Sequence, residues 1–114
     1  MNIKTKTSAL MAFFVFLLFG QPAAAASKTA NDLLDQCQIN NNLAIIACHI
    51  YVHAVQDVLA ENPVKNYRVC IPPNLDIDQS VNLIVDWLKQ HPEESQQPAS
   101  DAVAHALWCS YHCK

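Results

Sequence analysis

The 114-residue sequence predicts an all-α fold: a small disulfide-stapled bundle of about four helices. Apolar residues recur with the helical period of 3.6 in several segments. The only glycine is Gly20, near the N-terminus, whereas the tight turns of β hairpins favour glycine. Five cysteines in so short a chain indicate a disulfide framework, which a small domain needs because its core alone is marginal.

The N-terminus has the features of a secretory signal peptide. Lys4 and Lys6 precede an apolar run over residues 9–19. That run fits a signal peptide and is shorter than the roughly 20 residues that span a bilayer. Small residues follow it, so Ser27 is the expected first mature residue and Ala26 the alternative. An uncleaved membrane anchor is the competing interpretation.

We therefore expect residues 1–26 to be removed and residues 27–114 to form an exported, periplasmic domain. That domain has five Lys or Arg against ten Asp or Glu, a formal net charge of −5. An acidic surface disfavours nucleic acid and anionic lipid. We expect no nucleic-acid partner, no membrane association after cleavage, and a surface suited to a basic partner.

Two helices are expected in the first half of the mature chain. Asn31 can cap a short helix that stops at residues 40–42, where asparagine tolerates the left-handed conformation. Residues 43–59 are the most apolar mature segment. Their polar side chains lie on one narrow stripe, which predicts a central helix buried on most sides: His49, His53, Gln56 and Asp57.

Residues 61–69 lack periodicity and are expected to form a loop. Asp76 and Gln79 make a capping-box pattern for a third helix, which Pro92 stops. Leu83 and Trp87 lie on the flank of this helix. Its inward stripe is expected to be Ile77, Val81, Ile84, Val85 and Leu88.

Pro98 suits the first turn of a fourth helix, which the chain leaves at Tyr111. The period places one set of residues inward: Ala99, Ala102, Val103, Ala106 and Leu107. It places another set on the outer stripe: Asp101, His105 and Cys109.

The expected helices favour two disulfides. Cys37 ends the first helix and Cys48 lies one turn into the second, across a tight turn. Cys113 follows the last helix and can swing back to Cys70, although Cys70 to Cys109 is the alternative closure. Cys109 is then the unpaired thiol, either inert or able to link two chains.

The candidate metal ligands are His105, Cys109, His112 and Cys113, together with His49 and His53 one helical turn apart. An oxidising compartment takes thiolates as disulfides, so we expect no metal and no cofactor. Cys109 with His105 at i, i+4 is the one pair suggesting thiol catalysis. The common catalytic motifs are missing from the sequence, and we expect the protein not to be an enzyme.

The mature chain resembles the Rap/Tai family, periplasmic immunity proteins against type VI secretion amidases. The resemblance rests on Cys48-x-x-Tyr51 with Asp57, Cys70-Ile71-Pro72, Gln79, Leu88 with His91-Pro92-Glu93, Pro98-Ala99, Ala106-Leu107 and Cys113. The chain departs from the family in Ile50 and Ala54, where glycines are usual. It also departs in Tyr111-His112-Cys113, where Phe-Pro-Cys is usual, and in the extra Cys109.

The resemblance implies a small helical protein, often a homodimer, that occupies the substrate cleft of a secreted Cys-His peptidoglycan amidase. We favour the loop between Pro92 and Pro98 as the plug, because two prolines stiffen it; its residues are Glu93, Glu94, Ser95, Gln96 and Gln97. Lys65 and Arg68, on the other polar loop, are next in line. The competing interpretations are a solvated connection, a periplasmic chaperone or stress protein, and a family member without a toxin partner.

Overall fold

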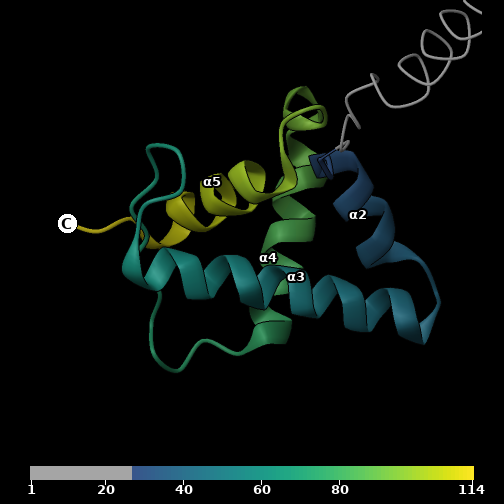
Figure 1. Ribbon diagram of the computed structural model, residues 1–114, viewed down its shortest axis with the longest axis horizontal. Coiled ribbons are helices and arrows are strands. Elements are labelled where there is room, and N and C mark those ends of the chain that lie inside the picture. Colours follow the sequence, from purple (N-terminus) through teal and green to yellow (C-terminus); the bar gives the residue numbers. More distant parts are fainter. Residues whose placement is uncertain (1–26) are drawn as a thin grey trace, which may run out of the picture.

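The computed structural model describes residues 27–114, and the predicted signal peptide lies outside the described residues. The described chain is helical, as predicted (Figure 1), with elements α2 (Ala30–Gln38), α3 (Asn42–Glu61), α4 (Ile77–Gln90), the 3₁₀ helix η1 (Pro92–Glu94) and α5 (Ala99–Tyr111). Every pair of the four α helices is in contact. In Figure 1, α4 crosses behind α3, and α5 packs beside α4.

The four helices enclose one hydrophobic core. Leu33 of α2, Ile84 of α4 and Leu107 of α5 are among its largest fully buried side chains. The inward residues predicted for α5 are all buried, and Ala104 joins them. On α4, the flanking Trp87 is more buried than expected, whereas Ile77 and Val85 are half-buried.

The two predicted disulfides are present. Cys37 and Cys48 join α2 to α3, with Cα atoms 5.2 Å apart. Cys70 and Cys113 join the chain before α4 to the tail after α5, with Cα atoms 5.0 Å apart. Cys109 is unpaired and exposed. The alternative closure from Cys70 to Cys109 is therefore wrong.

The helix ends differ from the prediction at three places. Thr29, not Asn31, caps α2, because its hydroxyl accepts the Asp32 N–H while the Asp32 carboxylate accepts the Thr29 N–H. Asn41 is extended (φ −146°) and caps α3 rather than adopting the left-handed conformation. The last helix includes Tyr111. The Asp76–Gln79 capping box of α4 is confirmed.

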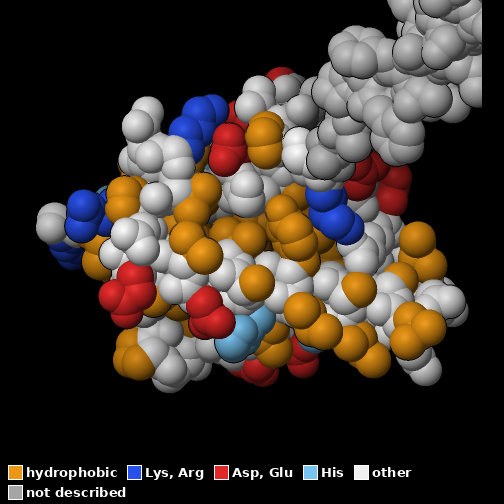
Figure 2. Space-filling model, in the orientation of Figure 1, with side chains coloured by type: hydrophobic (Ala, Val, Ile, Leu, Met, Phe, Trp, Pro, Cys, Tyr) orange, Lys and Arg blue, Asp and Glu red, His pale blue; other side chains and the backbone are white. Residues whose placement is uncertain are grey.

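The expectation that α3 is buried on most sides is wrong. Only Cys48, Val52, Val55 and Leu59 are buried. The other helices cover one side of α3 and leave large apolar residues exposed, among them Leu43 (77%) and Ile50 (64%). Figure 2 shows apolar side chains gathered along the N-terminal half of α3. Among residues 27–114, α3 is also the one helix long and apolar enough to cross a membrane, a property that it shares with core helices of soluble proteins.

Candidate functional site

The loop between α4 and α5 is held by backbone hydrogen bonds to the start of α2. The Ala30 N–H donates to the Gln97 carbonyl (2.8 Å), and the Asn31 N–H donates to the Ser95 carbonyl (3.0 Å). The Ala99 N–H donates to the Lys28 carbonyl (2.9 Å). These bonds fix the second half of the loop, and the first half is held by its own turn bonds from the Glu94 N–H to the His91 carbonyl and from the Ser95 N–H to the Pro92 carbonyl. Its stiffness therefore comes from pairing with residues 28–31 as well as from its prolines.

Within this loop, the two glutamates have different surroundings. Glu94 lies 3.5 Å (Oε1) from Nδ1 of His105 on α5, and both side chains are about one-quarter exposed. Glu93 is exposed, as are Gln96 and Gln97. The outward surface of the loop therefore consists of Glu93, Gln96 and Gln97, while Glu94 faces the body of the protein.

The second polar loop is also a compact turn. Val64 and Tyr67 exchange two backbone hydrogen bonds (3.2 and 2.9 Å), with Lys65 in the left-handed conformation (φ 55°) between them. Arg68 leaves the turn, and its carbonyl accepts the Cys113 N–H (3.4 Å). Lys65 and Arg68 are both exposed.

A row of aromatic and imidazole rings in contact, two pairs stacked and one tilted, joins the two loops across α5. Tyr67 of the second loop stacks on His105, with centroids 4.5 Å apart, and His105 lies 4.8 Å from Trp87 of α4. Trp87 in turn stacks on His91 at 4.1 Å. Figure 1 shows both loops rising on the same side of the molecule with α5 between them. The two protrusions therefore form one composite face.

His105 was expected on the solvent-facing stripe of α5, and that expectation is wrong. Tyr67 and Trp87 cover its ring, so it is half-buried, as is Asp101 one turn earlier. The sequence does carry a signal for this row. Trp87 and His91, the residue that follows α4, are spaced i, i+4, which places their rings on the same side of the end of the helix.

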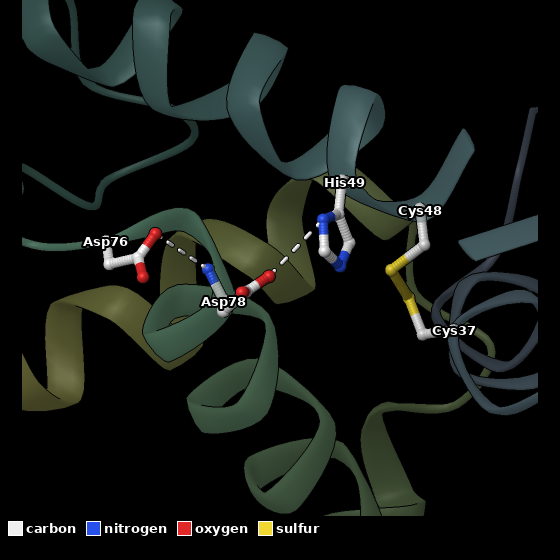
Figure 3. Close-up of polar contacts among 5 residues, drawn as sticks. All are labelled: Cys37, Cys48, His49, Asp76 and Asp78. Carbon is white, nitrogen blue, oxygen red and sulfur yellow. Dashed lines mark hydrogen bonds and ion pairs between the residues drawn. A yellow bond between two sulfur atoms is a disulfide. The ribbon is translucent and has the colours of Figure 1, made fainter. Parts of the chain in front are cut away.

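His49 and His53, considered above as metal ligands, are instead beside carboxylates. Nδ1 of His49 lies 3.5 Å from Oδ1 of Asp78 at the start of α4 (Figure 3), next to the Cys37–Cys48 bridge. Nδ1 of His53 lies 3.4 Å from Oδ2 of Asp57. Over residues 27–114, the structure brings together no group of three His, Cys, Asp or Glu side chains that could hold a metal ion.

Cys113, the fourth candidate metal ligand, is used in a disulfide. Cys109 and His112 are exposed, and Nδ1 of His112 donates to the Trp108 carbonyl (3.3 Å). The four candidates at the end of the chain are thus divided between a disulfide, a ring stack and the protein surface.

The fold and this face define a class of protein: a small, all-helical protein braced by two disulfides, with an exposed loop that is hydrogen-bonded to the start of α2. A comparison with family models then identifies the family. The model of the Rap1a immunity proteins matches residues 29–113, from the cap of α2 to the last disulfide cysteine, and the chain belongs to this family. Neither the curated proteins nor the solved structures contain a match. The chain is thus an immunity protein, whose role implies binding a toxin partner.

Proposed function

We propose that this protein is a periplasmic immunity protein that blocks the active-site cleft of a type VI secreted peptidoglycan amidase, the Cys-His enzyme class. It thereby protects the producing cell or its siblings. The family match supports the immunity role, and two disulfides suit an oxidising compartment such as the periplasm. The sequence features of a signal peptide point to the same compartment.

The observation that carries this proposal is the pinned loop of residues 92–98. An inhibitor that enters a cleft loses conformational freedom on binding, and a loop already ordered in the free protein avoids much of that loss. Hydrogen bonds from Ala30 and Asn31 provide this order. Glu93, Gln96 and Gln97 then point away from the body and are available to the cleft.

The test uses a purified Cys-His peptidoglycan amidase encoded beside the gene for this chain. The variant Glu93→Lys reverses the outward charge without touching the Glu94–His105 contact. We expect it to weaken inhibition, and Glu93→Lys with Glu94→Lys to weaken it further. Asp86→Lys makes the same charge change at an exposed position of α4 and is the matched control. Full inhibition by both loop variants would move the plug to Lys65 and Arg68.

The same proposal includes a homodimer formed through α3. Leu43, Ile46 and Ile50 are exposed and spaced i, i+3 and i+7, so they form one stripe. Residues 36–56 contain no Asp, Glu, Lys or Arg. An uncharged apolar stripe suits burial against a second copy. Light scattering should show a dimer for the wild type and a monomer for Ile46→Asp with Ile50→Asp; a monomeric wild type would remove the dimer from the proposal.

The exposed apolar stripe of α3 also favours a second candidate function, a small periplasmic chaperone or stress protein that shields unfolded clients. Two assays in solution distinguish these functions. Suppression of client aggregation at low pH without amidase inhibition would favour the chaperone. Inhibition that survives Ile46→Asp with Ile50→Asp would favour the immunity protein, because the plug lies on a different face.

A further inference from the structure

His105 contacts both polar loops from its position on α5. Its ring stacks on Tyr67 of the second loop, with centroids 4.5 Å apart and planes 12° apart. Its Nδ1 atom lies 3.5 Å from Oε1 of Glu94 in the plug, and its ring lies 4.8 Å from Trp87 of α4. Over the described chain, no backbone hydrogen bond joins the two loops directly. His105 therefore links two loops whose backbones are not paired with each other.

Both acidic and basic groups lie near His105. Glu94 contacts it, and Asp101 lies one turn earlier on α5. Lys65 and Arg68 belong to the second loop and are exposed, so solvent screens their repulsion of a protonated imidazole. The Glu94 carboxylate is only about one-quarter exposed and is screened less. Protonation of His105 therefore strengthens its attachment to the plug.

Two further titratable side chains lie near His105. Cys109 is one turn later on α5, and His91, after the end of α4, stacks on Trp87. Histidines change charge between about pH 5 and 8, so the His91 and His105 imidazoles have to be followed separately. On the other side, Tyr67 presents an aromatic face, which attracts a positively charged ring. Protonation of His105 therefore also strengthens its contact with the second loop.

We infer that His105 is a positioning residue that holds the plug and the second loop in one arrangement, and holds them more firmly when its imidazole is protonated. A toxin then meets two loops already placed relative to each other, which reduces the conformational entropy lost on binding. The link strengthens as pH falls through the range in which histidine gains a proton. The effect on inhibition rests on the proposed function, whereas the link between the loops is a property of the free protein.

The first experiment measures amide hydrogen exchange by NMR in the free, full mature chain. The amides of Glu94, Ser95 and Gln97 form hydrogen bonds within the plug and report its order. Their protection factors, which correct for the intrinsic effect of pH on exchange, should rise as the His105 imidazole resonance titrates toward its protonated form. Constant protection across that titration would overturn the inference. This measurement needs no substitution, so it does not depend on a variant that folds.

Substitutions then separate the two contacts of His105. His105→Phe keeps a planar ring against Tyr67 but removes Nδ1, so it should lower plug protection about two- to fivefold and abolish its pH dependence. His105→Ala should lower protection in both loops. His53→Phe is the matched control, because Nδ1 of His53 lies 3.4 Å from Asp57 on α3, and it should leave both loops unchanged. Wild-type protection in both loops of His105→Ala would contradict the positioning role.

Inhibition of the purified neighbouring amidase is the second readout. The ratio of the inhibition constants of His105→Phe and the wild type cancels the pH dependence of the enzyme itself. This ratio should rise about two- to fivefold between about pH 7.5 and 5.5. A ratio that does not change with pH would overturn the inference and leave the proposed function standing. If the wild type does not inhibit the amidase, the proposed function is overturned, and the exchange measurements alone decide the role of His105.

Discussion

The Cys70–Cys113 disulfide gives the most quantitative prediction. It closes a ring with a sequence separation of 43, which contains the whole of α4, η1 and α5. In the chain-entropy treatment, a ring of this length stabilises the folded state by about 4 kcal/mol, because it restricts the unfolded chain. The shorter Cys37–Cys48 ring, with a separation of 11, contributes about 3 kcal/mol.

Replacing Cys70 and Cys113 by serine should therefore lower the free energy of unfolding by about 4 kcal/mol. For a domain of this size, that loss lowers Tm by roughly 15–30 °C. Backbone hydrogen bonds at the site, such as Cys70 N–H to the Tyr111 carbonyl (2.8 Å), stay available in the variant. The folded state should thus keep its helices, and the loss should arise mainly in the unfolded state.

The assay is urea unfolding followed by circular dichroism without reductant, with mass spectrometry to count free thiols. Cys109→Ser is the matched control and should change stability by less than about 0.5 kcal/mol, since this thiol is exposed and unpaired. A loss below about 1 kcal/mol for the Cys70 and Cys113 variant would refute the reasoning. So would an exported wild type that is folded and active with every thiol reduced.

Three further predictions concern the helix cap, the core and pH. Thr29→Ala should cost about 1 kcal/mol in urea unfolding, because it removes the hydroxyl that caps α2; an unchanged midpoint would contradict this. Leu107→Ala should cost about 2–5 kcal/mol because the side chain is fully buried, whereas the exposed control Leu43→Ala should cost less than about 0.5 kcal/mol. Hydrogen bonds from the Thr29 backbone and hydroxyl lower the pKa of Asp32, so its stabilisation is present above the unfolded value of about 3.9 and is lost as pH falls through the lower folded value. The stability difference between wild type and Asp32→Asn should shrink over that acid range, and a pH-independent difference would contradict the assignment.

Local signals in the sequence were sufficient for most of the fold. The capping box of Asp76 and Gln79, the stop at Pro92 and the lack of glycine after Gly20 each act within a few residues, so they can be read without tertiary structure. The disulfides followed from helix order, because each pair joins chain ends that the turns bring together. The sequence could not predict how much of α3 is buried. Apolar residues around the whole helix do not show how many of its sides the other helices of the same chain cover.

The composite face depends on contacts between distant segments. The hydrogen bonds from Ala30 and Asn31 to the loop of residues 92–98 join chain positions more than 60 residues apart, and backbone pairing leaves no mark in side-chain pattern. The stack of Tyr67 on His105 likewise needs the loop after α3 to fold over α5. The sequence predicts that His105 faces solvent, because it lies on the polar stripe of its own helix. The ring that covers it belongs to Tyr67, on a different segment of the chain.

The central claim is that a pinned loop on a covalently braced helical body closes the cleft of a secreted amidase. Its most direct test is a titration of the neighbouring amidase, acting on peptidoglycan, with the wild-type chain and with the Glu93→Lys, Glu94→Lys variant. The account predicts complete loss of cleavage once wild-type protein is stoichiometric with the enzyme, and residual cleavage with the variant. A stable complex in which the amidase still cuts peptidoglycan at its full rate would contradict it.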